Sequence, residues 1–452
     1  MRSEPSAACR SDIGTGLVTR CYRGITLRIL YADSAVEGFA GHHATSVLAL
    51  PAALRNLGHE VIVAGYAGVL PEMRERTGAL PVFRAQTYLG PSTDPISGWL
   101  TNFLWARDVT LEDLTRFCSE SGPFDLIYFN SARAPQVAAL GLWLRQQAGH
   151  GLTSPPVVIE LAIEAGLTRT SSGTYRVRDV AATLLLHCRE WLGDEVFGQL
   201  IFVTGCRQAV EEYTAIFSGP VHLAPMPQPL PIPRLRKRAA GEPHSLTVGF
   251  LGHQRTDKGY QIVPALTQHI LHRHPNVRVL VQQSEPGTMK STSDEIARLA
   301  HDDKRVELIL RPFTAQDWFA LLDRCDIIAL PYTQTRYETS ASAILGEALA
   351  SGAPVVVPAR TTLSSVVDDL DGPGTTFDRW ESPSIASGIA EAIDRFDELA
   401  KRAFQAGRRW RERHGPDHFA RAVLALAAQR PGASHGLSTR AANRHDLRIV
   451  VD

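Results

Sequence analysis

The chain has 452 residues, of which 44% are hydrophobic and 21% charged, and its 47 basic side chains equal its 47 acidic ones. This length exceeds what one hydrophobic core supports, so we expect two domains of roughly 200 residues each. The balanced charge argues against nucleic acid as a partner. No apolar run in the sequence approaches the roughly 18 residues that a membrane-spanning helix requires.

The six cysteines are widely spaced, which indicates neither a zinc site nor a disulfide framework. Such spacing is typical of a reducing compartment, so we expect a cytoplasmic protein without a metal site. Residues 1–24 carry charges but no apolar core, unlike a secretory signal. We expect a disordered leader there.

Short apolar runs alternate with helical patterns over residues 25–228, which predicts a doubly wound α/β domain. The expected strands are residues 27–31, 61–64, 124–129, 156–159, 201–204 and 221–224, and the clearest helices are residues 44–56 and 207–216. Gly38 and Gly41, in the loop after the first strand, would let a ligand approach the backbone. They do not complete the dinucleotide fingerprint, so a Rossmann dehydrogenase is only weakly supported.

Several polar side chains of this half lie where open parallel sheets bind ligands, at the ends of strands. His42 and His43 share the first loop, and His43 is a candidate for catalysis or acceptor binding, with a plain surface role as the alternative. Three further candidates follow later strands: Asn130, Glu160 and Glu164. The aromatic stretch 99–105 is interpreted as a mobile segment that lines an acceptor cleft, with local packing as the alternative.

Proline-rich sequence from residue 225 to residue 243 marks a domain boundary, and we assign residues 229–243 to an interdomain linker. Its prolines oppose helix and central strand alike. Its cations, Arg234, Arg236, Lys237 and Arg238, are expected to keep it solvated. An alternative role for the same cations is peripheral contact with the inner face of a membrane.

The second half repeats the α/β pattern over residues 244–400. The expected strands are residues 246–251, 277–282, 306–310, 327–330 and 355–357, and the expected helices are residues 260–273 and 315–325. A helical run over residues 400–429 is expected to cross back onto the first domain, as residues 401–429. A polar tail, residues 430–452, is expected to be disordered.

Two segments of this half indicate a nucleotide-sugar site. In the loop after residue 251, Gly252 permits a tight exit from the strand, and Arg255 and Lys258 supply two cations that suit a diphosphate. We favour phosphate binding over the alternative, a solvated turn. In residues 336–358, the small residues 339–343 would open a helix whose amides can hold a phosphate. Glu347 would then face a hydroxyl pair such as a ribose diol.

On that expected helix, Ser340, Ala343 and Glu347 follow the three-and-four spacing of one helical stripe. Side chains on a helix lean toward its N-terminus, so Glu347 would reach toward the phosphate expected at that end. The alternative is a helix that packs on a parallel sheet and binds no ligand.

These features together resemble the GT-B glycosyltransferases, in particular the large family-four group, over residues 25–428 and most strongly over residues 249–358. The family's F-V-G-R-L-x-x-x-K-G appears as FLGHQRTDKG at residues 250–259. Lys258 falls on its phosphate-binding lysine, and His253 stands at its arginine, with Arg255 as a possible substitute.

The family also has two glutamates with seven residues between them, followed by A-x-A-x-G-x-P-V-V. EALASGAPVV, residues 347–356, matches the second half of this motif. Glu347 takes the place of the glutamate that holds the donor's ribose, whereas Thr339 stands at the first glutamate. In the first domain, Gly41 and His42 lie where the family often has two glycines.

The resemblance implies two Rossmann-like domains that face each other across a cleft, and a sugar transfer from a UDP- or GDP-sugar to a sugar, glycan or glycolipid acceptor. It implies retention of anomeric configuration with no metal and no cofactor, and a place in polysaccharide or glycoconjugate biosynthesis. Lys258, Arg255 and His43 are the expected catalytic residues. The expected donor-binding residues are Gly252, His253, Lys258, Thr339, Ser340, Ala341, Ser342 and Glu347.

Two alternatives stay open. Thr339 at the glutamate position, and the lack of an evident counterpart to the family's strand-end histidine, suggest a GT-B module that binds without catalysis. The same two-domain form also serves sugar-nucleotide epimerases. The sequence does not indicate an oligomeric state.

Overall fold

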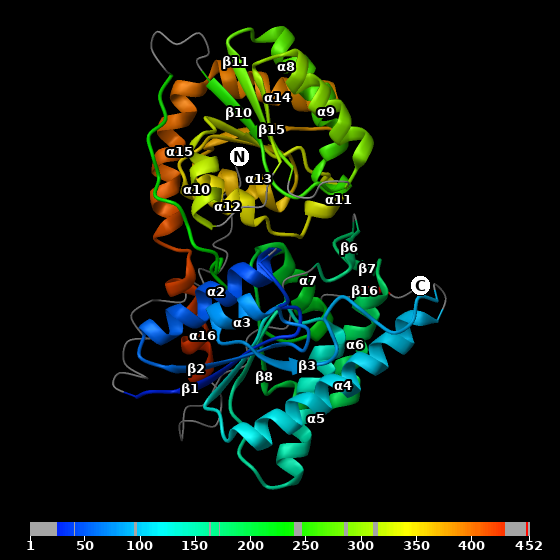
Figure 1. The fold of residues 1–452 in the computed structure, drawn as a ribbon. Coiled ribbons are helices and arrows are strands. Elements are labelled where there is room, and N and C mark those ends of the chain that lie inside the picture. Colours follow the sequence, from blue (N-terminus) through cyan, green and yellow to red (C-terminus); the bar gives the residue numbers. More distant parts are fainter. Residues whose placement is uncertain are drawn as a thin grey trace, which may run out of the picture.

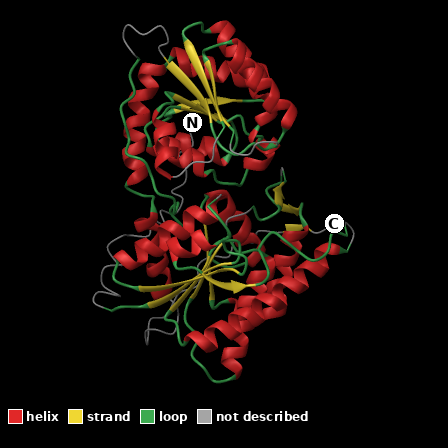
Figure 2. Cartoon of the chain, in the orientation of Figure 1, coloured by secondary structure: helices red, strands yellow, loops and turns green. Residues whose placement is uncertain are grey.

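Two parallel sheets, each covered by helices on both faces, form the two halves of the computed structural model (Figures 1 and 2). The structure describes residues 25–39, 41–94, 97–161, 164–170, 172–238, 246–283, 288–310, 315–429 and 449–450. The expected disordered leader, residues 1–24, lies outside this range, as does nearly all of the expected tail, residues 430–452. The two sheets confirm the predicted α/β fold class.

The first sheet has seven strands in the order β3-β2-β1-β4-β5-β8-β9, all parallel to their neighbours. Its strands are β1 (Arg28–Asp33), β2 (Glu60–Tyr66), β3 (Leu80–Phe83), β4 (Leu126–Phe129), β5 (Val157–Glu160), β8 (Leu200–Thr204) and β9 (Val221–Leu223). Every residue of β4 and β5 is buried. Their continuous apolar runs are typical of parallel strands covered on both faces.

The helices of the first half that flank this sheet are α2 (Gly41–Asn56), α3 (Pro71–Thr77), α4 (Gly98–Ser121), α5 (Ala134–Gly149), α6 (Val180–Phe197) and α7 (Arg207–Phe217). The stretch 99–105, interpreted from the sequence as a mobile segment, lies in the first turns of α4. Phe103 and Ala106 are buried one helical turn apart. Asn102 Oδ1 accepts a hydrogen bond from Ser92 N (2.9 Å), and Asn102 Nδ2 donates one to Ser92 O (2.9 Å). These contacts hold the segment in the helix.

A short hairpin stands beside the first sheet. Strands β6 (Leu167–Arg169) and β7 (Tyr175–Val177) pair antiparallel, and β16 (Ile449–Val450) pairs parallel with β7. The hairpin lies on the side of the first half that faces the second (Figure 1).

The second sheet has six strands in the order β12-β11-β10-β13-β14-β15, again all parallel. They are β10 (Leu246–Phe250), β11 (Val277–Gln282), β12 (Val306–Ile309), β13 (Ile327–Ala329), β14 (Val355–Pro358) and β15 (Gly374–Phe377). The helices around them are η1 (Thr256–Lys258), η2 (Tyr260–Ile262), α8 (Val263–Arg273), α9 (Lys290–Asp302), α10 (Ala315–Asp323), α11 (Gln334–Tyr337), α12 (Ala343–Ala350), α13 (Thr362–Asp369) and α14 (Ser382–Asp394).

The last two helices return the chain to the first half. The expected single run over residues 400–429 is two helices, α15 (Phe396–Arg411) and α16 (Pro416–Ala428), separated at Gly415 with φ 111°. Helix α15 ends at Arg411, and Gly415 is the N-cap of α16. Residues with a side chain rarely adopt the backbone conformation of Gly415, so glycine permits the turn between the two helices. Phe419 and Val423 of α16 are buried in the core around β1 and β2.

The chain thus crosses between the halves twice, and the two crossings are bonded together. The backbone of Met226, in the first crossing, accepts a hydrogen bond from Gly415 N (2.9 Å) and donates one to His414 Nδ1 (3.0 Å), both in the second. The Arg411 guanidinium also donates to the backbone oxygen of Leu230 (2.6 Å).

The linker is less solvated than the sequence suggested. Arg236 is buried at 8% exposure, and its guanidinium donates to the backbone oxygens of Cys325 (2.7 Å), Ser351 (2.7 Å) and Leu322 (2.9 Å). Arg238 donates to Ile393 O at the end of α14 (2.6 Å). Carbonyls at the ends of helices have no partner within the helix, so these cations close the helix ends. The expectation that these cations are solvated was therefore wrong for Arg236, whereas Arg234, Lys237 and Arg238 are exposed. Residues 239–243 of the expected linker lie outside the described residues.

Candidate functional site

Segments that follow strands of both sheets meet between the two halves. From the first half, Cys206 after β8 donates its thiol hydrogen to the backbone oxygen of Thr339 after β13 (2.9 Å). Glu164 after β5 pairs with Arg336, also after β13. Because the carboxyl ends of parallel strands share one edge of a sheet, both sheets present their ligand-binding edges to this interface.

The glycine loop after β10 is shaped by two positions that only glycine fits. Gly252 has φ 114° and Gly259 has φ 70°. An added Cβ would lie 2.4 Å from Ile344 Cδ1 at the first position and 1.9 Å from the Pro331 backbone oxygen at the second. Residues 256–258, between these glycines, form η1, and Lys258 Nζ would lie only 3.4 Å from a Cβ at Gly252.

Lys258, in this loop, and Glu347, on α12, are two titratable groups close enough for each to shift the pKa of the other. Burial lowers the pKa of Lys258 to about 8, the nearby Arg255 adds to the effect, and Asp257 and Glu347 oppose it. Burial raises the pKa of Glu347 to about 7, opposed by the Trp318 hydrogen bond and by Lys258. The Trp318 indole donates to Glu347 Oε2 over 2.8 Å. A poorly hydrated ammonium gains strongly from an anionic ligand, because little water has to be displaced.

Arg255 differs from the expectation of a second available cation. Its Nε donates to Asp257 Oδ1 over 2.8 Å, and a second guanidinium nitrogen bonds the other carboxylate oxygen. The loop therefore carries a neutralised Arg255 beside Lys258. His253 is exposed on the same loop.

The predicted phosphate-binding segment also differs from the expectation. Helix α12 begins at Ala343, and Ser342 is its N-cap, with a side-chain oxygen that accepts from Leu345 N over 3.2 Å. Serine is a favoured cap because its hydroxyl satisfies an amide that the first turn leaves unpaired. Thr339, Ser340 and Ala341 thus precede the helix, so Ser340 does not share a helical stripe with Glu347.

On the other side of the interface, His42 and His43 lie in the first turn of α2 rather than in a loop. His43 is buried, and its Nδ1 lies 2.9 Å from both oxygens of Asp33, while its Nε2 lies 2.8 Å from the Tyr88 hydroxyl. Asn130 Nδ2 donates to Asp33 Oδ2 over 2.6 Å. Both ring nitrogens of His43 are therefore engaged within the first half.

The same network continues to Glu160. The Tyr128 hydroxyl bonds the Glu160 carboxylate and lies 3.2 Å from Asn130 Oδ1. Burial raises the pKa of Glu160 to about 7, against the effect of the Tyr128 hydrogen bond. Asn130 and Glu160, both candidates from the sequence, are thus members of one buried polar network with Asp33.

His42 is the member of the histidine pair that faces the second half. The residue is exposed at the surface of the first half. Desolvation and the charges of His43, Arg255 and Lys258, opposed by Asp33, together lower its pKa to about 4. Its ring centroid lies 4.1 Å from that of His43. A neutral imidazole opposite Lys258 can accept or donate a hydrogen bond without repelling the cations.

Comparisons with known proteins give partial sequence matches. No model of a protein family matches the chain. A D-inositol 3-phosphate glycosyltransferase of Corynebacterium aurimucosum is 31% identical over 140 residues, 30% of this chain and 32% of the relative. The same enzyme of Corynebacterium kroppenstedtii is 30% identical over 139 residues, 29% of this chain and 30% of the relative. The match spans about a third of the length of these curated relatives.

Solved structures match nearly the whole chain. Sucrose-phosphate synthase from Thermosynechococcus elongatus superimposes with a TM-score of 0.58 at 15% identity, over 88% of this chain and 96% of that one. HepE from Anabaena, solved with UDP and glucose, gives 0.58 at 16% identity, over 89% and 100%. The chain has the GT-B fold. The predicted resemblance to GT-B glycosyltransferases is thereby confirmed.

Within this GT-B fold, the structure brings Gly252, Lys258 and Glu347 together, as the sequence suggested. It engages Arg255 with Asp257 and His43 with Asp33. Sequence reasoning missed Asp33 and Tyr88, and it favoured His43 over His42. The one available signal was the match of Gly41 and His42 to the family's two glycines.

Neither a metal cluster nor a membrane span is found in the described part of the chain. No group of three or more His, Cys, Asp or Glu side chains there could hold a metal ion. No helix there is both long enough and apolar enough to cross a bilayer.

Proposed function

We propose that this protein is a glycosyltransferase that moves a sugar from a nucleotide-sugar donor to an acceptor. The observation that carries the proposal is the pair of Lys258 and Glu347 at the carboxyl edge of the second sheet, within a GT-B fold. One supplies a desolvated ammonium for a diphosphate and the other a buried carboxylate for hydroxyls. The curated relatives, named as glycosyltransferases, support it.

The second half, residues 244–400, would hold the donor, a UDP- or GDP-sugar. UDP is the choice that the HepE complex favours. Lys258 would offset the charge that develops on the departing diphosphate. Arg255 would help once the diphosphate draws it from Asp257, and the backbone amides of residues 339–342 would add further donors. Glu347 would accept hydrogen bonds from the ribose.

The first half, residues 25–228, would hold the acceptor, a sugar, glycan or glycolipid. The charges of Lys258 and Arg255 reach His42 from the second half, so His42 would be the histidine that touches the reacting groups. His43 would orient α2 through Asp33. Closure of the halves would exclude water and protect the donor from hydrolysis. We further propose retention of configuration without a metal or a cofactor, in polysaccharide or glycoconjugate biosynthesis.

The test is calorimetric titration of UDP, GDP and ADP into the wild-type protein and into Glu347→Gln. We expect one nucleotide to bind best and the substitution to weaken it. Asp326→Asn is the control, because it neutralises another partly buried carboxyl of the same sheet at the opposite edge, where Asp326 accepts from Thr247 N (2.8 Å). Folded protein that binds none of the three nucleotides would refute the donor site.

A binding module without catalysis is the second candidate. Thr339, at the position of a motif glutamate, offers its backbone oxygen to Cys206 and has no carboxylate. Nucleotide binding without transfer or donor hydrolysis would favour this candidate. Conversion of the sugar nucleotide without any acceptor would instead indicate an epimerase.

A further inference from the structure

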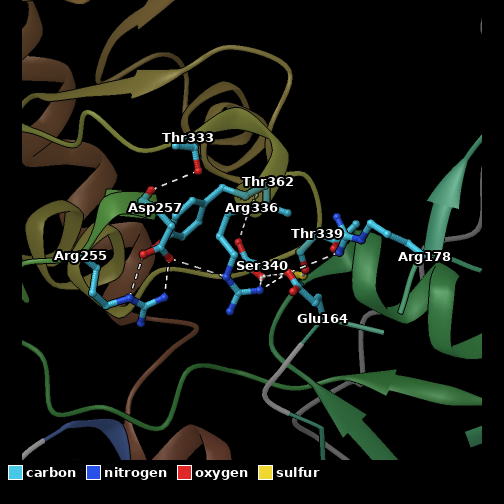
Figure 3. Close-up of polar contacts among 11 residues, drawn as sticks. Glu164, Arg178, Arg255, Asp257, Thr333, Arg336, Thr339, Ser340 and Thr362 are labelled. Atoms are coloured by element: carbon cyan, nitrogen blue, oxygen red, sulfur yellow. Dashed lines mark hydrogen bonds and ion pairs between the residues drawn. The ribbon is translucent and has the colours of Figure 1, made fainter. Parts of the chain in front are cut away.

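Arg336 lies at the centre of the polar contacts between the two halves (Figure 3). It belongs to α11, the four-residue helix after β13. Its Nη1 donates to the Glu164 carboxylate of the first half and to Ser340 Oγ, the latter over 2.9 Å. Its Nε lies 3.8 Å from Asp257 Oδ2. One guanidinium therefore touches three segments that are far apart in sequence.

Two of these segments belong to the proposed donor site. Asp257 is in η1, next to Lys258, and Ser340 lies just before the cap of α12. The third contact, Glu164, is the only one of the three in the first half, and Arg178 of that half lies 3.7 Å from the same carboxylate. Arg336 thus connects the glycine loop after β10 and the segment 339–342 to the first half.

The Arg336–Glu164 pair is partly withdrawn from water. The side chains retain 30% and 26% of their exposure. Fully exposed ion pairs contribute little to stability because water and salt screen them. A pair at this depth is screened less, and the planar guanidinium can serve several acceptors at once.

The charges around Asp257 also allow an exchange of partners. Arg255 and Arg336 both approach its carboxylate. A diphosphate that draws Arg255 away would leave Asp257 to Arg336 alone. A cavity of about 360 Å³ borders the network and is lined by Glu164, Arg178, Thr256, Asp257 and Arg336 among others. It gives the side chains room for this change.

We propose that Arg336 is a positioning residue for the transfer reaction. When it is bound to Glu164, Arg336 holds the glycine loop after β10 and the segment 339–342 in the arrangement that receives the donor. The same contact keeps the two halves closed. This inference rests on the proposed function for its donor part, whereas its closure part concerns the two halves alone.

The test compares Glu164→Gln, Arg336→Gln and the double variant with the wild type. Glu164→Gln is the informative one, since it leaves every residue of the second half unchanged. The control is Asp369→Asn, which removes another ion pair between the halves, Arg207–Asp369 at 3.3 Å, with exposures of 71% and 56% and no contact with the donor loops. Thermal unfolding of each variant checks that the fold is intact.

Small-angle X-ray scattering and UDP and GDP titrations are the two readouts. We expect Glu164→Gln and Arg336→Gln each to increase the radius of gyration and to weaken nucleotide binding roughly fivefold to tenfold, as the loss of a charge-assisted contact between partly buried groups would. The double variant should lose no more than Arg336→Gln alone. Asp369→Asn should change neither readout.

The outcomes separate the two proposals. Unchanged scattering and unchanged affinity in Glu164→Gln would overturn the role of Arg336 and leave the donor site standing. If the wild type bound no nucleotide, the proposed function would fail. Scattering of the ligand-free variants would then still decide whether the pair closes the halves. Independent, additive losses in the double variant would also contradict the shared role.

Discussion

Nδ1 of His43 lies 2.9 Å from both carboxylate oxygens of Asp33, and the carboxylate is wholly buried. Asn130 donates to the same carboxylate. The pair ties the start of α2 to the end of β1, so it fixes the helix turn that presents His42 to the second half. The contact between His43 and Asp33 therefore contributes both to the stability of the first half and to the position of His42.

Asp33→Asn should destabilise the protein by about 2–3 kcal/mol, because His43 and Asn130 would then share one amide oxygen instead of two carboxylate oxygens, which leaves a buried polar group unsatisfied. Urea unfolding measures the change. Asp397→Asn, at an exposed pair with Arg238, should change the free energy of unfolding by less than about 0.5 kcal/mol. Equal effects of the two substitutions would show that the Asp33 network is not structural.

Lys258→Met should reduce sugar transfer by roughly 10²- to 10³-fold, the loss expected when one preorganised group that stabilises transition-state charge is removed. Initial rates with the donor identified by titration would measure it. Lys290→Met removes an exposed lysine paired with Asp294 and should leave the rate within about twofold. A Lys258→Met enzyme with normal turnover would remove Lys258 from the mechanism.

Nucleotide affinity should fall as the pH rises through about 8, because the pKa of Lys258 is lowered to about that value. Only the ammonium form attracts a diphosphate, whose own charge is already complete there, since a phosphate's second pKa is about 6. Titrations between pH 7 and 9.5 should show the decline in the wild type and no such decline in Lys258→Met. A flat profile in the wild type would mean that Lys258 does not contact the phosphates.

Stability should also depend on pH through Glu347. Burial raises its folded-state pKa to about 7 from a usual value of 4.5, so the folded protein holds a proton that the unfolded chain has released. Its favourable contribution is complete below pH 4.5 and is lost as the pH rises through about 7. The loss is on the order of 2–3 kcal/mol. Glu347→Gln should flatten the unfolding free energy between pH 4.5 and 7, whereas an unchanged slope would contradict this assignment.

Gly259→Ala should prevent the Lys258 loop from adopting its conformation. The new Cβ would lie 1.9 Å from the Pro331 backbone oxygen, so the cost should exceed the roughly 1 kcal/mol of a left-handed alanine. Gly58→Ala is the matched control, with φ 91° and nothing within 4 Å of the new Cβ. We expect a clearly larger drop in melting temperature, and lost nucleotide binding, for Gly259→Ala alone. Equal drops would show that the loop can move aside.

The sequence predicted the elements that local patterns determine. Strands such as β4, β10 and β11 are short apolar runs, which parallel sheets bury on both faces. Strand β3, with Pro81 among four residues, and α4, whose aromatic residues hid its period, gave no such signal. The glycine loop and Glu347 were found because their spacing is local.

The remaining parts of the site depend on long-range contacts. Asn130 meets Asp33 across 97 residues, and Arg336 meets Glu164 across 172. No spacing rule connects such positions. Arg236 illustrates the same limit, since its charge suggested a solvated linker, whereas the fold directs its guanidinium to carbonyls at helix ends.

The bond between Met226 and Gly415 joins the two passages of the chain between the halves. Because the two connecting segments are bonded to each other at one point, the halves can rotate about that point but can slide or separate only a little. A cut within residues 229–243 would not release either half, because α15 still leads into α16. Genetic exchange faces the same constraint: a hybrid that takes its first half from a related enzyme must also take that enzyme's α16, since Phe419 and Val423 fill the first core from the far end of the gene.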